Sequence, residues 1–250
     1  MSLVRRRLVA VLVAVAALAT ACGGAGRTEP GKGTGALSVV ASFYPVAEAA
    51  RRVGGDAAAV TNLTPPGVEP HDLELTPVQV DTLEDADLVL YLGRGFQPAI
   101  EAVVERRKGP SVDLLADVGA EDPHFWLDPI RMARAVGHVE KAMSAADPDD
   151  IAAFRANAER YQTDLRALDS ELEAGLAGCR RRVLVTSHAA FHYLADRYGL
   201  TQQALSGISP EAEPDPQRLA ELTDLIRREG VTTVFYEELV PASLARTLAR

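Results

Sequence analysis

The chain has 250 residues, of which 47% are hydrophobic and 24% are charged, so it has enough apolar side chains to bury a sizeable core. Its formal net charge is −9, and without the three arginines Arg5–Arg7 the remainder carries −12. Only 5% of the residues are aromatic. This composition argues against nucleic acid as a partner, because an acidic body repels phosphates and has few rings for stacking on bases.

The first 21 residues have the pattern of a secretory signal peptide. The basic segment Arg5–Arg7 precedes Leu8–Ala19, an apolar run of twelve residues, whereas a membrane-spanning helix needs about 20. Ala19-Thr20-Ala21-Cys22 resembles a bacterial lipobox, so we expect lipidation of Cys22; an ordinary signal peptide with an incidental cysteine is the alternative. The glycine-rich residues 22–35 are expected to form a flexible tether. The mature protein is therefore expected outside the cytoplasm, anchored to the cell membrane by lipid.

From Ala36 onward, short apolar and β-branched runs alternate with helical patterns. Several runs are continuously apolar, which is typical of parallel strands covered on both faces. Helices are expected to begin where Thr76 or an aspartate precedes a proline, because such residues cap helices. The predicted strands are 37–42, 57–63, 87–92, 112–115, 183–187, 203–206 and 232–236, and the predicted caps are Thr76, Asp128, Asp147 and Asp215.

The middle of the chain interrupts this alternation. No strand is predicted between Asp128 and Gly178, only two helices, of which the second is long. We expect an α/β fold of two lobes, each a parallel sheet covered by helices, joined by this long helix. The expected boundaries are 36–146 for the N-terminal lobe, 147–178 for the linking helix and 179–250 for the C-terminal lobe. Two ordinary surface helices are the alternative for the middle segment. Cys179 is expected to be a buried small hydrophobe or half of a disulfide with a partner beyond the end of the sequence.

Five histidines are the candidate metal ligands. His71 and His124 lie in proline-bounded loops, and His188 directly follows a predicted buried strand. Ligands bind at the carboxyl edge of open α/β sheets, and imidazole is a good zinc ligand, so these three side chains could share one cation. Their spacing leaves open the alternative that each is an ordinary core or surface residue. His192, one helical turn after His188, is either a further ligand or a surface residue, and His138 is interpreted as an ordinary helix residue.

Five sequence blocks, in order, resemble one protein family. Glu69-Pro70-His71-Asp72 is the first, and the others are 122–129, 186–191, 208–214 and 235–239. Together they resemble the zinc/manganese solute-binding proteins of ABC transporters, over nearly the whole chain from Ala36.

This resemblance implies a metal site in the cleft between two lobes joined by a rigid helix. It implies His71 and His124 as ligands from the first lobe and His188 from the second. The expected ion is Zn²⁺, with Mn²⁺ as the alternative, because manganese members tend to carry Glu where this chain has a histidine, a softer ligand. The His-rich loop of many zinc members is absent, since residues 108–122 contain no histidine.

The family's fourth ligand is a carboxylate that follows a further strand and helix near the C-terminus. This sequence stops at Arg250, before such a block. We therefore expect an incomplete C-terminal lobe, with water, Glu69, Glu237 or His192 at the fourth position.

The function that the resemblance implies is binding, and not catalysis. We expect a monomer that captures extracytoplasmic Zn²⁺ and delivers it to the permease of an ABC transporter. A metal-dependent adhesin of the same family is one alternative. A zinc hydrolase is another, because three histidines with an open position are also a catalytic pattern. The sequence has no His-Glu-x-x-His helix and no evident general base except Glu69 and Asp72.

Overall fold

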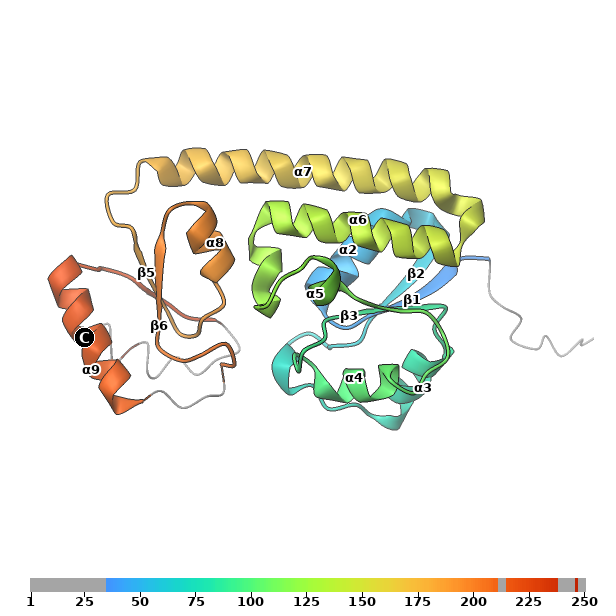
Figure 1. Cartoon of the computed structure of the whole chain (residues 1–250), viewed down its shortest axis with the longest axis horizontal. Coiled ribbons are helices and arrows are strands. Elements are labelled where there is room, and N and C mark those ends of the chain that lie inside the picture. Colours follow the sequence, from blue (N-terminus) through green and yellow to red (C-terminus); the bar gives the residue numbers. More distant parts are fainter. Residues whose placement is uncertain (1–34, 211–214, 238–245, 247–250) are drawn as a thin grey trace, which may run out of the picture. The chain divides into compact units, whose positions relative to one another are not determined.

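The computed structural model describes residues 35–210, 215–237 and 246. Cys22, the predicted signal peptide and nearly all of the predicted tether lie outside these residues. The described residues from Ala36 onward belong to one unit, in which strands and helices alternate (Figure 1). None of the helices within the described ranges is long and apolar enough to cross a membrane.

The first sheet has four parallel strands, in the order β2-β1-β3-β4. These are β1 (Leu37–Ala41), β2 (Ala58–Asn62), β3 (Leu88–Tyr91) and β4 (Ser111–Asp113). Side chains of the central strands alternate between two cores: Val39 and Leu90 enter one, and Val40 and Val89 enter the other. The central strands are therefore buried on both faces, which explains their continuously apolar sequences.

Helices cover both faces of this sheet (Figure 1). On one face lie α2 (Tyr44–Gly54) and α6 (Pro129–Ala146), and on the other lie α3 (Pro77–Asp85) and α4 (Pro98–Val104). The predicted caps are confirmed. Thr76 and Gln79 form a capping box at the start of α3, and the Asp128 carboxylate accepts the first N–H groups of α6.

The fourth predicted strand, 112–115, is wrong in its second half. β4 ends at Asp113, and the next residues form the short helix α5 (Leu114–Asp117). The Asp113 carboxylate accepts the N–H groups of Leu115 at 3.0 Å and Ala116 at 3.3 Å, so it caps a helix at this point. Leu114 and Leu115 are buried from this helix, which gives the same apolar pattern as a strand.

The long helix is present. Asp147 caps the short turn η4 (Pro148–Asp150), and α7 (Ile151–Ala177) then runs for 27 residues. Its first half packs on α2 and α6 through Phe154 and Ala158, which are buried. In its second half the Asp169 carboxylate accepts hydrogen bonds from the Arg197 guanidinium, so α7 also contacts α8 (His192–Arg197), a helix of the second sheet.

The second sheet has three parallel strands in the order β6-β5-β7 among the described residues. They are β5 (Val183–Thr186), β6 (Thr201–Ala204) and β7 (Val234–Phe235), and they are accompanied by α8 (His192–Arg197) and α9 (Pro216–Glu229). Leu205 and Leu222 form its small core. The α/β class with parallel sheets and a long helix is thus confirmed, while the boundaries 36–146, 147–178 and 179–250 remain predictions.

The expectation that Cys179 is buried is wrong. Cys179 follows α7 and is exposed, so it is not a buried small hydrophobe, and it is a free thiol among the described residues. A disulfide partner within the described part of the chain is therefore excluded.

Candidate metal centre

His71 is presented by the loop that follows β2. This loop contains Pro65, Pro66 and Pro70, and it ends in the short turn η2 (Pro70–Asp72). The Glu69 carboxylate accepts the backbone N–H of His71 at 3.2 Å and so caps this turn. The His71 ring lies edge-on to Phe96, with 4.6 Å between centroids. The ring is thus placed by a stiff loop and an aromatic neighbour.

His124 is held by the carboxylate of Asp122. It lies in η3 (Pro123–Leu127) and is 2% exposed. One oxygen of Asp122 accepts the backbone N–H of His124 at 2.9 Å and lies 2.7 Å from the ring Nδ1. Burial works to raise the pKa of Asp122, but the hydrogen bonds from His124 outweigh it and hold that pKa below its ordinary value. The charged carboxylate therefore orients the imidazole and leaves Nε2 for another partner.

His188 follows β5, the central strand of the second sheet, and is buried. Its backbone carbonyl accepts hydrogen bonds from Thr186 Oγ1 at 2.7 Å and from Gln202 Nε2 at 3.0 Å. Its ring Nδ1 lies 3.0 Å from Glu237 Oε1, and the other oxygen of Glu237 accepts a hydrogen bond from Ser187. Central strands mark the switch point of such sheets, where ligands bind at the carboxyl edge.

The three imidazoles converge. Each of His71, His124 and His188 offers one ring nitrogen, and these nitrogens all lie within 4.8 Å of one another. The Nε2 atoms of His124 and His188 are 3.4 Å apart. Two nitrogens bound to one tetrahedral zinc at 2.0–2.1 Å would be separated by about 3.3 Å. The pair therefore already has the separation that a shared zinc ion requires.

An aromatic wall backs the cluster on the first-sheet side. The Trp126 ring lies 5.1 Å from that of His124 and 4.8 Å from that of Phe43, and Phe43 lies 5.0 Å from Phe96. Phe43 and Phe96 follow β1 and β3, the two adjacent central strands. These rings displace water, so charge interactions at the imidazoles are screened less than in solvent.

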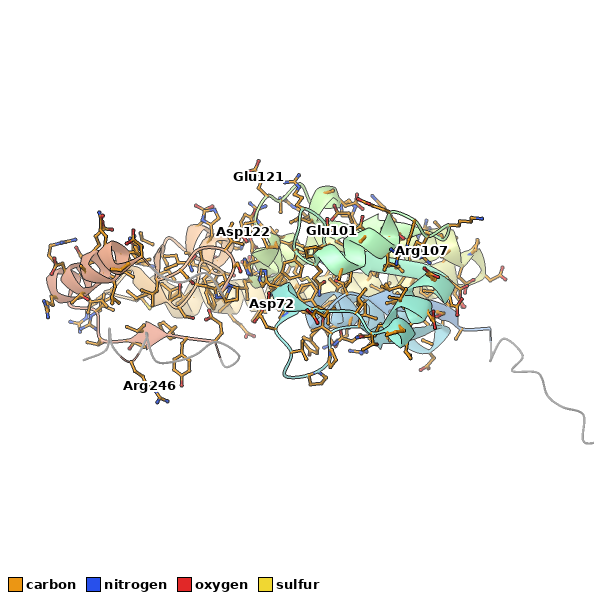
Figure 2. The ribbon with its side chains drawn as sticks, turned by 90° about the horizontal axis from the view of Figure 1, so that it is seen from below. Asp72, Glu101, Arg107, Glu121, Asp122 and Arg246 are labelled. Atoms are coloured by element: carbon orange, nitrogen blue, oxygen red, sulfur yellow. The ribbon has the colours of Figure 1, made fainter. Side chains whose placement is uncertain are left out.

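Two carboxylates lie behind the cluster, and their roles were not foreseen in the sequence. Asp122, labelled in Figure 2, contacts Nδ1 of His124, and Glu237 contacts Nδ1 of His188. A carboxylate hydrogen-bonded to the outer nitrogen, as Asp122 is to His124, fixes the tautomer of a metal-binding histidine and increases its basicity. Glu237 lies close to His188, but its Oε1 and the Nδ1 of His188 make no hydrogen bond. For Asp122 the sequence does carry a signal, because an aspartate two residues before the histidine with proline between them can bond to both its backbone and its ring.

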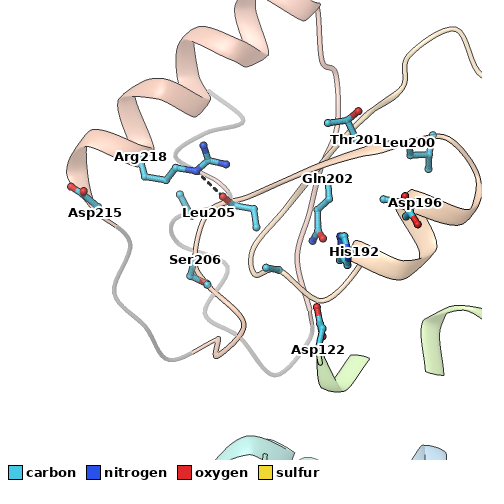
Figure 3. A pocket seen from close by; sticks show the side chains of 14 residues that line it. Asp122, His192, Asp196, Leu200, Thr201, Gln202, Leu205, Ser206, Asp215 and Arg218 are labelled. Carbon is cyan, nitrogen blue, oxygen red and sulfur yellow. Dashed lines mark hydrogen bonds between the residues drawn. The ribbon is translucent and has the colours of Figure 1, made fainter. Parts of the chain in front are cut away.

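The weaker ligand candidates occupy other places. Glu69 caps η2, and Glu237 faces the outer nitrogen of His188 rather than its Nε2. His192 is exposed at the start of α8, on the wall of a cavity of about 790 Å³ that Asp122 also lines (Figure 3). His138 lies on α6, with its Nδ1 3.5 Å from Asp117. Among the described residues, the group that can hold a metal ion contains only the three histidines named above.

The fold and this cluster define a class: an α/β protein with two parallel sheets and a candidate transition-metal site built from imidazoles. The family model for ZnuA, the periplasmic component A of the zinc-uptake complex, matches residues 39–250. The chain belongs to this family.

Individual relatives agree with this assignment. The zinc-binding lipoprotein AdcA of Streptococcus pneumoniae is 36% identical over 240 residues, which cover 86% of this chain and 48% of AdcA. The chain thus spans about half the length of the AdcA relatives it matches. The Zn(II)-bound ZnuA-like domain of the same AdcA superposes with a TM-score of 0.73 at 37% identity, covering 86% of this chain and 84% of that domain. The laminin-binding protein Lmb of Streptococcus agalactiae, described as a bifunctional adhesin and metal transporter, gives a TM-score of 0.79 at 29% identity over 86% of this chain and 85% of Lmb.

Proposed function

We propose that this chain is a zinc receptor: it binds one Zn²⁺ outside the cytoplasm through His71, His124 and His188 and delivers it to the permease of an ABC transporter. The observation that carries the proposal is the convergence of the three ring nitrogens within 4.8 Å. Membership of the zinc-uptake family supports it. The receptor acts as a monomer, and its partners are the permease and, through a lipid anchor, the membrane.

Zinc is preferred over manganese because of the donor atoms. Three neutral imidazoles suit Zn²⁺, whereas Mn²⁺ favours carboxylate, carbonyl and water oxygens. The carboxylates of Asp122 and Glu237 face outer ring nitrogens and so add no oxygen ligands, and the hydrogen bond from His124 to Asp122 strengthens nitrogen donation by His124. We propose that water fills the fourth position, because Glu69 caps η2, Glu237 faces the outer nitrogen of His188 and His192 is exposed. In a competition titration the chain should retain Zn²⁺ in the presence of a hundredfold excess of Mn²⁺.

The site serves binding and not hydrolysis. A hydrolase needs a general base within reach of metal-bound water, but Asp122 and Glu237 are each engaged with a histidine ring on the side away from the cluster. An assay of the zinc-loaded chain with a model ester tests this. Turnover that disappears in His188→Ala would establish the hydrolase instead.

Anchoring rests on the sequence, since Cys22 lies outside the described residues. The mature protein begins at a lipidated Cys22 and is held at the outer side of the cell membrane; stable attachment needs more than one acyl chain, as in bacterial lipoproteins. Mass spectrometry of the native N-terminus tests this. A Cys22→Ser protein that stays with the membrane fraction would contradict it.

Adhesion is a second candidate function, because Lmb is described as both adhesin and metal transporter. Laminin is the probe: the immobilised protein is tested for binding of the zinc-loaded and zinc-free chain. Laminin binding that requires zinc would add the adhesin role, and its absence would leave the transport receptor alone.

The central experiment measures zinc binding by titration against a competing chelator. The wild type should bind one equivalent, and His71→Ala, His124→Ala and His188→Ala should each lower the affinity sharply. At a free zinc concentration 100 times the dissociation constant, bound zinc stabilises the fold by about 2.7 kcal/mol, which for this chain length raises the melting temperature by about 5–10 °C.

The matched control is His138→Ala, because His138 is a half-buried histidine on α6 that pairs with Asp117 of α5 and is not part of the cluster. It should bind zinc like the wild type. If His138→Ala and His188→Ala lose affinity equally, the proposed site is wrong.

A further inference from the structure

Two side chains of α8, the helix that follows His188, reach the His124 segment: Arg197 pairs with Asp128 at 3.5 Å, and Tyr193 contacts the residues just before His124. Tyr193 lies on α8, and its hydroxyl oxygen accepts the backbone N–H of Glu121 at 3.3 Å and that of Asp122 at 3.2 Å. Glu121 and Asp122 are labelled in Figure 2. We propose that Tyr193 is a positioning residue of the metal site, which sets where the Asp122–His124 pair lies relative to His188. This inference rests on the proposed zinc function.

The tyrosine ring is itself fixed. It is 8% exposed and packs with the first core, and the Arg131 guanidinium from α6 lies 4.0 Å from the ring centroid. A cation at this distance from an aromatic face attracts it, more strongly where water is excluded. The Tyr193 hydroxyl therefore has a defined position, and it holds the backbone N–H groups of Glu121 and Asp122 in place.

The position of the hydroxyl is passed to the ligand through one residue. Asp122 donates its backbone N–H to Tyr193, and its carboxylate holds both the backbone and the ring Nδ1 of His124. The far side of that ring is Nε2, 3.4 Å from Nε2 of His188. Tyr193 is only five residues after His188, so the same short segment carries one ligand and positions another.

The connection is needed because the two histidines come from different sheets. His124 is joined to the first sheet through α6, and His188 follows the central strand of the second. A small change of the angle between these elements would move one nitrogen away from the other. The paired hydrogen bonds to Tyr193 are placed next to the site, where they limit such a change most directly.

The test is Tyr193→Phe, which keeps the ring and its contact with Arg131 but removes the acceptor. Without it the N–H groups of Glu121 and Asp122 lose their partner, and a lost hydrogen bond of this kind weakens the arrangement that depends on it. Zinc affinity should fall about tenfold, which corresponds to about 1.4 kcal/mol. The visible absorption of bound Co²⁺, which reports the geometry of the ligands, should change as well.

The matched control is Tyr198→Phe. Tyr198 lies directly after the same helix and its hydroxyl donates a hydrogen bond to Asp169 at 2.9 Å, on α7 and not on the His124 loop. It should lose stability without metal but keep the wild-type zinc affinity and Co²⁺ spectrum. Arg131→Gln removes the cation that lies against the Tyr193 ring, and we expect it to lower zinc affinity as Tyr193→Phe does.

The outcomes separate the two proposals. Wild-type zinc binding that depends on the three histidines, together with Tyr193→Phe and Arg131→Gln proteins that bind zinc as the wild type does, would overturn the role of Tyr193 alone. So would equal losses of affinity in Tyr193→Phe and Tyr198→Phe. A wild type that binds no zinc would refute the proposed function, and this inference with it.

Discussion

Replacing Asp122 by asparagine tests how far the carboxylate behind His124 contributes to metal binding. The Asp122 oxygen lies 2.7 Å from Nδ1 of His124, and the two side chains are 13% and 3% exposed. At neutral pH the carboxylate is charged, because His124 holds the pKa of Asp122 below its ordinary value against the effect of burial. The pair is thus a short, charge-assisted hydrogen bond shielded from water.

The expected loss follows from the strength of that bond. An amide oxygen can still accept from Nδ1, but a charged acceptor makes a hydrogen bond about twice as strong as a neutral one. Partners of metal-binding histidines contribute about 10–100-fold to affinity, which corresponds to about 1.4–2.7 kcal/mol. Asp122→Asn should therefore bind zinc about 10–100 times more weakly than the wild type in a chelator competition at pH 7.5.

Asp147→Asn is the matched control. Asp147 also precedes a proline and accepts the N–H of the second following residue, Asp149, at 3.2 Å, but it contacts no histidine. Asparagine caps as well as aspartate does, so both variants should keep their caps, and only Asp122→Asn should lose zinc affinity. If Asp122→Asn binds zinc within twofold of the wild type, the carboxylate does not support the ligand and this reasoning is refuted.

Two further predictions concern stability. Phe154, on α7, is fully buried in the first core, so Phe154→Ala should cost about 3–5 kcal/mol and lower the melting temperature by about 6–20 °C in calorimetry; a shift below 3 °C would show that α7 packs loosely there. Burial and the hydrogen bond to Asp169 raise the pKa of Tyr198 to about 12, so the folded state favours the neutral phenol. That contribution is complete below about pH 10, the ordinary pKa of tyrosine, and is lost as the pH rises towards 12. Urea unfolding midpoints at pH 9 and pH 11 should therefore fall further for the wild type than for Tyr198→Phe, and equal falls would contradict the assignment.

The sequence predicted the fold where local chemistry and tertiary packing agree. The caps at Thr76 and Asp128 and the buried strands around β1, β3 and β5 are readable because capping and continuous apolar runs leave few alternatives. The prediction of a strand at Leu114 and Leu115 is wrong, because two buried leucines fit a strand and a short helix equally well. What decides between them is the Asp113 carboxylate, which caps a helix in the structure.

The site was predictable only in part. His71, His124 and His188 are candidate ligands from the sequence because they lie in stiff loops or at a strand end. Their convergence is not predictable in this way, because it depends on how residues far apart in the sequence come together in the fold. Glu237 was a ligand candidate in the sequence, and the structure places it against the outer nitrogen of His188. Tyr193 carried no signal at all, because a tyrosine on an apolar helix face has the pattern of an ordinary core residue.

The segment that carries His124 has no spare length. Asp122 caps η3, and Asp128 both ends η3 and begins α6, whose next turns are buried through Met132, Val136 and Val139. One residue inserted between the two aspartates would lengthen the link between the cap that holds His124 and the cap that begins α6. Because α6 is fixed in the first core, His124 would have to move, and its Nε2 would leave the position 3.4 Å from Nε2 of His188. We therefore expect a change of metal preference in this segment to come from an exchange of side chains and not from a change of its length.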